Sequence, residues 1–246
     1  MDEKPLNVSV VGLGKLGCPL AACFAAKGHN VVGVDSNPLT TEMVNQGRSP
    51  IFEPGLQELM DGHHSRIRAT GNTEEAVLAS DVTFVVVPTP SEPGGNFSPK
   101  YVLKACESIG LGIRAKTGYH LVVVASTIMP GCIGDEVRQT LERVSGKSCG
   151  EDFGLCFCPE RIDPLNKKWK LENIPRIIYC SDDYSFEISK IIYQHINNSQ
   201  LTRVTSSLAA EMVKSFENAF RLVNISLVNE LAVLCGKLNV DVNEII

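Results

Sequence analysis

Lys214 and Asn218 are residues whose types and spacing suggest chemistry. They stand four positions apart in a stretch of helical periodicity, so their side chains lie on one face of that helix. Two such donors can jointly stabilise an alkoxide as its negative charge develops. The spacing also allows a plainer interpretation, in which Glu211 and Lys214 form a solvent-exposed pair, because charged helix positions are usually solvated.

Thr127 and Glu160 are polar residues that follow apolar segments. Thr127 comes after "HLVVVAS" and Glu160 after "GLCFCP". Open α/β sheets bind their ligands beyond the carboxyl ends of the strands, but position alone does not assign a role to either residue. Taken alone, Thr127 could simply end a strand, and Glu160 could cap the segment that follows.

A glycine-rich turn near the N-terminus predicts a dinucleotide site. Gly12, Gly14 and Gly17 form G-x-G-x-x-G between an apolar run and a helix-forming run, and Asp35 closes the next apolar run. Gly12 permits the tight turn, Gly14 lets the backbone approach a pyrophosphate, and Gly17 lets helix and strand pack closely. Asp35 would accept from a ribose hydroxyl, and no Arg or Lys follows it to meet a 2′-phosphate, so the sequence favours NAD over NADP.

Apolar β-branched runs alternate with helical stretches along most of the chain. This pattern predicts an α/β fold, a doubly wound parallel sheet with helices on both faces. The Pro- and Gly-rich segment 88–100 is predicted to be a loop after a strand. Helices are predicted over 16–27, 99–115 and 131–145, and strands in "NVSVVG", "NVVGVD", "VTFVVVPT", "HLVVVAST", "GLCFCPE" and "RIIYCS".

A long connecting helix is predicted from Ser206 to about Leu238. This stretch has no proline and one late glycine, its apolar residues recur at helical spacing, and Ser206 or Ser207 suits the N-cap. The helix would be about 45 Å long. We therefore expect a dinucleotide-binding domain over 1–203 and a long helix region over 204–246 that leads to a further domain absent from the chain.

The composition of the chain restricts the classes of molecule that it can bind. With 246 residues, 43% of them hydrophobic, the chain can bury a sizeable core, and its net charge of −5 argues against binding nucleic acid or anionic lipid. The longest apolar runs, such as 121–125, are too short to cross a membrane, and the acidic N-terminus lacks a signal peptide. We therefore expect a cytoplasmic protein that binds small molecules or protein.

The nine cysteines are scattered along the chain and are expected to be reduced and buried. Cys156 and Cys158 could form half of a metal site, with His63 and His64 as the other half. Zinc sites usually show ligand pairs separated by two residues, a spacing that these pairs lack, and alternation places both thiols on one face of a strand. No metal is expected.

Several motifs in a fixed order give the chain a family resemblance. They are "VGLGKLGCPLAACFAAKGHNVVGVD", "GRSPIFEPGLQELM", "VVPTP", "ASTIMPG", "CPERIDPLN" and "EMVKSFENAFRLVNISLVNELAVLCGK". Together they resemble the nucleotide-sugar dehydrogenase family along almost the whole chain. The resemblance implies a Rossmann domain, a nucleotide-sugar substrate and oxidation of the sugar's primary alcohol to a carboxylate, with two NAD reduced in turn.

The resemblance also implies roles for individual residues. Thr89 and Thr127 match contacts to cofactor and active-site water, and Glu160 matches an acid/base or water-ordering group. Lys214 and Asn218 match the pair that holds the oxyanion, and the family's use of the long helix in dimers implies a homodimer. The residues expected to bind NAD lie in the glycine turn or just beyond strands: Gly12, Gly14, Lys15, Leu16, Gly17, Asp35, Pro88, Thr89 and Thr127.

Two departures from the family pattern limit what can be carried over. The family's nucleophilic cysteine stands in a Gly-Gly-x-Cys loop that these 246 residues lack, and Cys235, inside the predicted helix, is not assigned that role. The chain is thus expected to be a fragment that supplies the NAD site and part of the active site.

The second departure concerns the substrate. Arg161 and Pro164 in "PERIDPLN" replace residues of the glucose-type enzymes, which favours a UDP-N-acetylhexosamine over UDP-glucose. Two alternatives stay open: a non-catalytic NAD-binding or dimerisation module, and a β-hydroxyacid dehydrogenase of the 6-phosphogluconate type.

Overall fold

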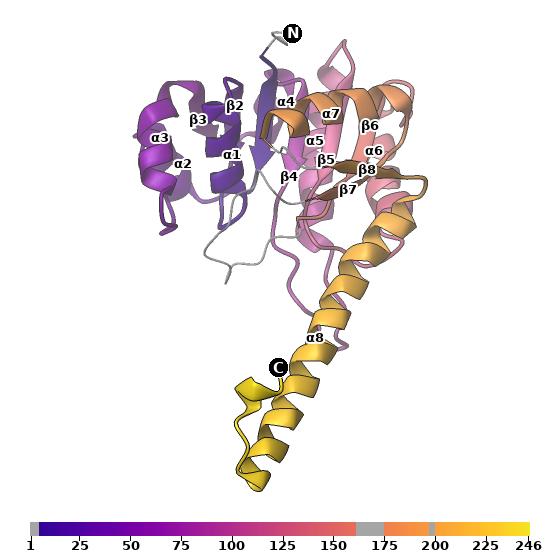
Figure 1. Ribbon diagram of the computed structural model, residues 1–246. Helices are drawn as coiled ribbons and strands as arrows, with labels where there is room; N and C mark the ends of the chain where they lie inside the picture. The colour runs from indigo at the N-terminus through magenta and orange to yellow at the C-terminus, as the bar shows by residue number, and fades with distance from the viewer. Residues whose placement is uncertain (1–4, 161–174, 197–199) are drawn as a thin grey trace.

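The fold is built around a twisted sheet of eight strands in the order β3-β2-β1-β4-β5-β6-β7-β8, counted over the described residues. In the computed structural model these are residues 5–160, 175–196 and 200–246 (Figure 1). Neighbouring strands run parallel except β6 and β7, which are antiparallel. The strands are β1 (Asn7–Val11), β2 (Asn30–Val34), β3 (Ile67–Thr70), β4 (Val82–Val85), β5 (His120–Val124), β6 (Phe153–Phe157), β7 (Arg176–Cys180) and β8 (Leu201–Val204).

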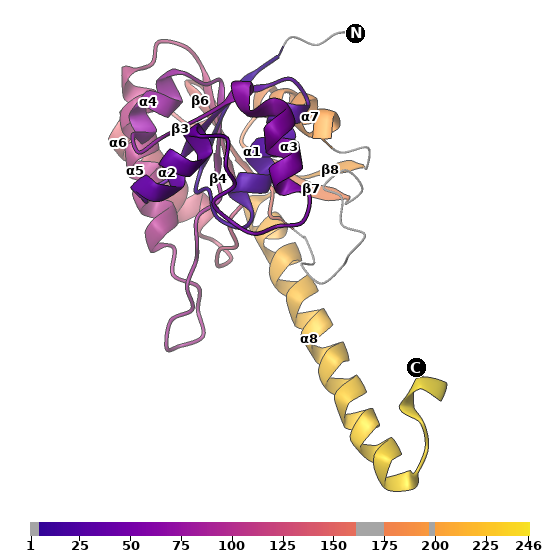
Figure 2. The same cartoon turned by 90° about the vertical axis from the view of Figure 1, so that its left-hand side faces the viewer.

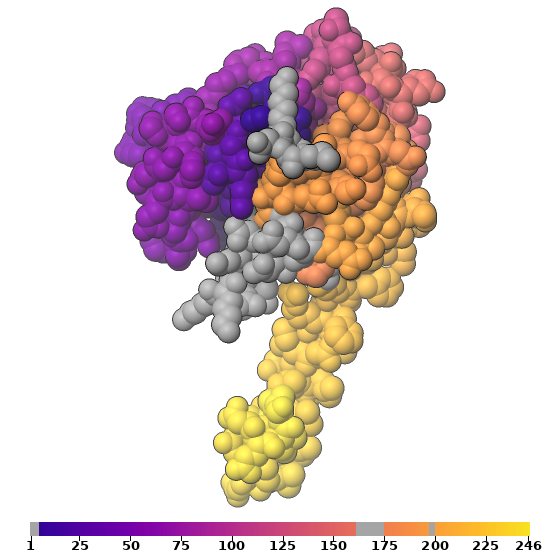
Figure 3. All heavy atoms as spheres, turned by 45° about the horizontal axis from the view of Figure 1, so that its top comes forward, coloured from indigo at the N-terminus to yellow at the C-terminus, as the bar shows by residue number. Residues whose placement is uncertain are grey.

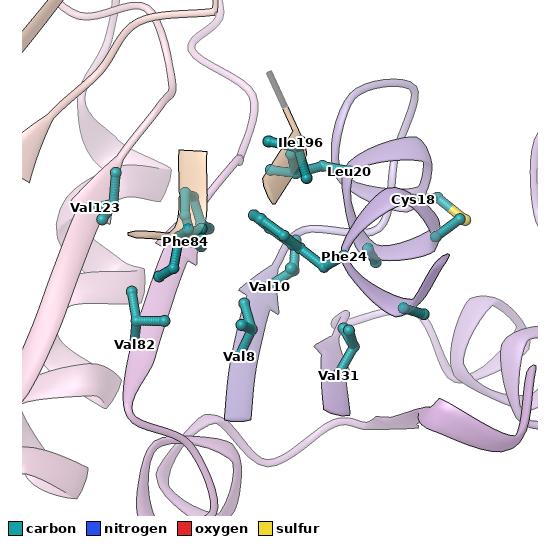
Figure 4. Close-up of a cluster of buried hydrophobic side chains, with 14 of the residues drawn as sticks. Val8, Val10, Cys18, Leu20, Phe24, Val31, Val82, Phe84, Val123 and Ile196 are labelled. Carbon is teal, nitrogen blue, oxygen red and sulfur yellow. The ribbon is translucent and has the colours of Figure 1, made fainter. Parts of the chain in front are cut away.

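Helices cover both faces of the sheet. One apolar cluster joins the sheet to α1, α3 and α7, and a second joins it to α4, α5 and α6. Figure 4 shows the first cluster, in which Phe24 of α1 and Phe84 of β4 pack with ring centroids 4.8 Å apart. The helices are α1 (Gly17–Ala26), α2 (Pro38–Asn45), α3 (Leu56–His63), α4 (Thr73–Leu78), α5 (Lys100–Ala115), α6 (Arg138–Ser145), α7 (Asp183–Ile196) and α8 (Ser207–Leu238), with short turns η1 (His64–Arg66), η2 (Ile133–Val137) and η4 (Val242–Glu244).

The predicted doubly wound α/β fold is confirmed, with differences at its edges. β3 and β8 are additional strands, and β7 runs against β6. The predicted helix over 131–145 begins with the π-helical turn η2 before α6. The predicted domain boundary between 203 and 204 falls inside β8, and the division into two domains stays a prediction.

The carboxyl ends of β1 and β4 mark the point where the chain changes direction across the sheet. β2 lies on one side of β1 and β4 on the other, so the loops after β1 and β4 leave the same edge side by side. Open α/β sheets bind ligands at such a switch point. The glycine turn therefore lies where a cofactor would be expected.

The long helix α8 projects from the body of the molecule (Figures 1 and 2). The Oγ atom of Ser206 accepts a hydrogen bond from the backbone N–H of Ala209 at 3.0 Å, which confirms the predicted N-cap. The buried residues of α8 are Ala210 and Glu211 near its start and Cys235 near its end. The space-filling view shows the C-terminal part of the helix standing clear of the body (Figure 3).

The expectation that no segment is long enough to cross a membrane is wrong for α8. The helix has 32 residues, and a window within it reaches a mean hydropathy of 1.4, enough for a span by length and composition alone. The expectation rested on uninterrupted apolar runs, whereas α8 intersperses its apolar residues with polar ones. The same properties describe a helix that packs against a protein partner.

Acidification is expected to destabilise the fold through His120, the first residue of β5. Burial, and then the neighbouring Lys116 charge, lowers the pKa of His120 from 6.5 to about 3. Between these values the unfolded chain binds a proton that the folded chain excludes, so this contribution to stability is complete above pH 6.5 and falls as the pH drops. The free energy of unfolding should decrease by about 1.4 kcal/mol per pH unit from this group.

Urea unfolding between pH 4.5 and 7.5 tests the role of His120. The variant His120→Gln, less stable at neutral pH because it disturbs the contact with Thr83, should show a shallower pH dependence than the natural chain. An unchanged slope in the variant would assign the acid sensitivity to other groups.

Candidate cofactor site and active site

The glycine turn has the geometry that a dinucleotide requires. Gly12 has a φ of +97°, and a Cβ atom there would lie 2.4 Å from the carbonyl oxygen of Val86. A Cβ atom on Gly17 would lie 1.7 Å from the oxygen of Gly12, so only glycine lets α1 begin so close to the turn. A Cβ atom on Gly14 would meet nothing within 4 Å, which leaves room for a phosphate beside the backbone.

Asp35 lies directly after β2 and is fixed against the glycine turn. Its Oδ2 atom accepts from the backbone N–H of Leu13 at 2.9 Å, and Oδ1 accepts from that of Asn37 at 2.9 Å. Carboxylate oxygens keep lone pairs for further donors, so Asp35 can also accept from a ribose hydroxyl. The exposed residues Lys15 and Leu16 complete the turn at the start of α1.

The loops after β4 and β5 are tied together by Ser126, a residue that the sequence analysis did not single out. Its buried hydroxyl accepts a hydrogen bond from the backbone N–H of Val87 at 2.9 Å and donates one to the backbone oxygen of Val87 at 2.8 Å. Pro88 and Thr89 follow Val87, and Thr127 follows Ser126. One serine hydroxyl therefore holds both predicted cofactor loops at the same edge of the sheet.

Glu160 lies just beyond β6, beside the loop of Thr127. Its backbone N–H donates to the oxygen of Ala125 at 3.3 Å. Its carboxylate forms a buried ion pair with Arg176 of β7, with 3.1 Å between Nη1 and Oε2. The pairing depends on the antiparallel course of β7, which brings the start of this strand to the carboxyl edge of β6.

Arg176 is a buried cation with two aromatic or charged neighbours, Glu160 and Tyr193. Burial opposes its charge, but the adjacent Glu160 carboxylate outweighs this effect, and the pKa of Arg176 is raised. The guanidinium carbon lies 5.0 Å from the ring centroid of Tyr193. Its Nε and Nη2 atoms are buried without a hydrogen-bond acceptor among the described residues. Arg176 was not among the site residues predicted from the sequence, because its position beside "IIYC" does not reveal its pairing with Glu160.

Glu211 contradicts the solvent-exposed pair that spacing allowed. Its side chain is fully buried, and its carboxylate accepts from the backbone N–H groups of Gly131 and Ile133 at 2.8 and 2.7 Å. It therefore joins α8 to the loop after β5. Lys214 is half-buried further along the helix, and Asn218 is exposed beyond it.

The described hollows lie elsewhere than the four residues Thr127, Glu160, Lys214 and Asn218, whose shared pocket stays a prediction. A hollow of about 180 Å³ is lined by residues of α7, β7 and their neighbours, and an open one of about 660 Å³ lies along 49–58. In the described part of the chain, no group of three or more His, Cys, Asp or Glu side chains could hold a metal ion.

All nine cysteines are free thiols, and seven of them are buried as expected, whereas Cys23 and Cys149 are only half-buried. Burial raises the pKa of Cys158, next but one to Glu160, to about 11, so its thiol is protonated at neutral pH. Cys235 is buried within α8, and no role is assigned to it. The substrate argument from Arg161 and Pro164 falls outside the described residues.

A mainly parallel sheet with a glycine turn at its switch point and an acidic residue after β2 defines a dinucleotide-binding protein of the Rossmann type. Two family profiles match the chain. The profile of the "UDP-glucose/GDP-mannose dehydrogenase family, NAD binding domain" matches residues 6–197, and that of the family's central domain matches 208–246. The chain belongs to the UDP-glucose/GDP-mannose dehydrogenase family, and its cofactor is NAD. The predicted resemblance is confirmed and favoured over the 6-phosphogluconate-type alternative.

Individual relatives agree with the family assignment. The GDP-mannose 6-dehydrogenase of Pseudomonas aeruginosa is 34% identical over 243 residues, which are 98% of this chain and 55% of the relative. A crystal structure of a ternary complex of GDP-mannose dehydrogenase from that organism is 33% identical with a TM-score of 0.92, over 98% of this chain and 55% of the other.

A UDP-glucose dehydrogenase from the archaeon Pyrobaculum islandicum is 33% identical with a TM-score of 0.91, over 99% of this chain and 56% of the other. The chain spans about half the length of the curated relatives it matches. These 246 residues therefore correspond to the NAD-binding domain and part of the central domain.

Removal of the Asp35 carboxylate is expected to weaken NAD binding. Asp35→Ala leaves a ribose hydroxyl contact unmade, which costs about 1 to 3 kcal/mol of binding free energy. Calorimetric titration with NAD and NADP measures this loss, and the natural chain should prefer NAD.

Asp81→Ala is the matched control, because Asp81 also accepts from a backbone N–H, that of Asn7 at 2.9 Å, but at the amino end of β1. An equal loss of affinity in both variants, or tighter binding of NADP by the natural chain, would exclude the assigned role of Asp35.

Proposed function

We propose that this chain forms the NAD-binding half of a nucleotide-sugar 6-dehydrogenase, which oxidises the primary alcohol of the sugar to a carboxylate. The observation that carries the proposal is the convergence of three elements at one edge of the sheet. The glycine turn and Asp35 provide the cofactor site, Thr127 and Glu160 follow adjacent strands at that edge, and α8 is anchored to the loop of Thr127 through Glu211.

The overall reaction has a defined balance. One primary alcohol, one water and two NAD⁺ give one carboxylate, two NADH and three protons. NAD, when bound, accepts the hydride at each of the two oxidations. The protein must stabilise the oxyanion at the reacting carbon, move the alcohol proton and order the water that supplies the second carboxylate oxygen.

The residues of this chain divide these tasks. Lys214 and Asn218 donate hydrogen bonds to the developing oxyanion. These hydrogen bonds are stronger in the transition state, where the oxygen carries negative charge, than in the complex with the neutral alcohol. Glu160, held by Arg176, and Thr127 order the water and move the proton. The trapping of the aldehyde by a thiol belongs to a Gly-Gly-x-Cys segment that these 246 residues do not contain.

The substrate is a nucleoside diphosphate sugar. The sequence favours a UDP-sugar, UDP-glucose or a UDP-N-acetylhexosamine, whereas matched relatives include a GDP-mannose 6-dehydrogenase. A panel of GDP-mannose, UDP-glucose, UDP-N-acetylglucosamine and UDP-N-acetylmannosamine separates these cases.

The test is the stoichiometry of NAD reduction. The full-length protein should produce two NADH per sugar oxidised with one member of the panel, whereas the 246-residue chain alone should bind NAD without completing the oxidation. NAD binding without turnover of any panel sugar by the full-length protein would favour the non-catalytic module. Two NADH per sugar from the 246 residues alone would require a nucleophile among them.

The same proposal includes assembly and location. Phe216, Phe220, Leu222 and Val223 of α8 are 65 to 73% exposed, which suits a second copy of the chain packed along this helix. We therefore expect a homodimer, and sedimentation velocity would measure this oligomeric state. A net charge of −5 disfavours nucleic acid and anionic membrane surfaces, and a second copy packed along α8 would cover its apolar residues, so we place the protein in the cytoplasm.

A further inference from the structure

The Glu211 carboxylate lies at the junction between α8 and the sheet. Both oxygens are used: Oε2 accepts from the N–H of Gly131 and Oε1 from that of Ile133. These donors belong to the start of the helical segment formed by η2 and α6, where the helix dipole favours a negative charge. A fully buried carboxylate with two backbone donors in this position is a built contact rather than a solvated surface charge.

This contact is part of a narrow attachment. The first turn of α8 packs beside η2, since a Cβ atom built on Gly134 would lie at an ordinary contact distance, 3.5 Å, from the Oγ atom of Ser207. Ala210 is fully buried in the cluster of α4, α5 and α6. Residues 213–215 of α8 are still half-buried, and the later part of the helix projects from the body of the molecule (Figure 2). The rotation of α8 about its axis is therefore set by its first turns, which contact η2, β6 and β7, and Glu211 supplies the hydrogen bonds between these turns and the loop after β5.

Helix geometry relates Glu211 to the proposed oxyanion donors. At about 100° and about 1.5 Å per residue, Lys214 lies ~60° around the helix and ~4.5 Å along it from Glu211. Asn218 lies ~20° around and ~10.5 Å along. Both side chains therefore leave α8 on the same side as Glu211, which accepts a hydrogen bond from Gly131 in the loop after β5. Thr127 stands four residues before Gly131 in that loop.

We propose that Glu211 is a positioning residue, which locks the rotation of α8 so that Lys214 and Asn218 face the loop of Thr127. This inference rests on the proposed function, because it assigns Glu211 to the alignment of that site. Glu211 touches no substrate in this arrangement. It acts through two backbone N–H groups, and a small rotation of α8 would carry the distant amide of Asn218 away from the reacting carbon.

The first test measures the contact itself in the 246-residue chain. In Glu211→Gln the side chain keeps its size, but one oxygen becomes an NH₂ group that faces a backbone N–H donor. Amide hydrogen exchange at Gly131 and Ile133 should become at least tenfold faster. The control Glu230→Gln, an exposed glutamate on the same helix, should leave both rates unchanged.

The second test separates positioning from general loss of structure. In the full-length enzyme, Glu211→Gln should lower kcat by about 100-fold, as for a misaligned catalytic group, with little change in the affinity for NAD. Parallel loss of kcat, NAD affinity and thermal stability would overturn the proposal, as would unchanged exchange rates at Gly131 and Ile133. A failure of the proposed function gives a different result. In that case Lys214→Ala would leave turnover unchanged, while Glu211→Gln would still speed amide exchange at Gly131 and Ile133.

Discussion

Lys214→Ala is expected to lower the turnover of the full-length enzyme by about 100-fold while the affinity for NAD stays nearly unchanged. The lysine would donate to an oxyanion whose charge exists only as hydride leaves, so its loss raises the barrier without weakening the bound ground state. The residues predicted to bind the dinucleotide, in the turn of Gly12 to Gly17 and at Asp35, belong to other elements than α8. Steady-state kinetics give kcat, and calorimetry gives the affinity for NAD.

Lys237→Ala provides the matched control. Lys237 is exposed in the last turn of the same helix, so its replacement removes an equal charge from α8 at a distance from the body of the molecule. Its turnover should match that of the natural enzyme. If Lys214→Ala also retained kcat within about threefold, the oxyanion role would be excluded, since a donor to developing charge contributes at least several-fold more.

The central strands and α8 could be predicted because their residue types and spacing match the local structure that they form. β1, β4 and β5 are rich in β-branched residues, and α8 keeps helical spacing over many turns without proline. β3 and β8, in contrast, are the short segments "IRAT" and "LTRV", whose polar residues hide the strand pattern. The antiparallel direction of β7 was not predictable, because strand composition does not encode direction.

The candidate site divides in the same way. The glycine turn was predictable because a tight turn, an open backbone and a close helix each require glycine, as Gly12, Gly14 and Gly17 show. Glu211 and Arg176 were not predictable, because a charged residue is usually solvated and the partners of these two are set by tertiary structure alone. Both residues became visible only when burial was combined with hydrogen-bond geometry.

The buried pair of Arg176 and Glu160 shows how tertiary structure gives a charge a large energetic effect. Arg176 side-chain exposure is 4% and Glu160 exposure is 9%, so both ions are almost fully removed from water. Removing two ions from water costs several kcal/mol per ion, which the attraction between them repays only in part. We infer that the pair orients Glu160 at the edge of the sheet rather than adding net stability.

Arg176→Met is therefore expected to lower the free energy of unfolding by about 3 to 5 kcal/mol, because it leaves a buried carboxylate without its cation. The double variant Arg176→Met/Glu160→Gln should recover most of this loss, since neither charge remains. Urea unfolding of the 246-residue chain without NAD measures all variants. Equal losses in the single and double variants would show that the stability depends on the packing of Arg176 and not on the charge of Glu160.

Arg203 offers a control that matches Arg176 except in burial. It pairs with Asp183 at 2.6 Å, and its guanidinium carbon lies 5.0 Å from the ring centroid of Phe186, as that of Arg176 does from Tyr193. Its side chain is 34% exposed and that of Asp183 is 95% exposed. Water screens this pair, so Arg203→Met should cost less than about 1 kcal/mol despite the shorter distance. If the two arginine variants lost equal stability, the stacking contact that they share would outweigh burial of the ion pair.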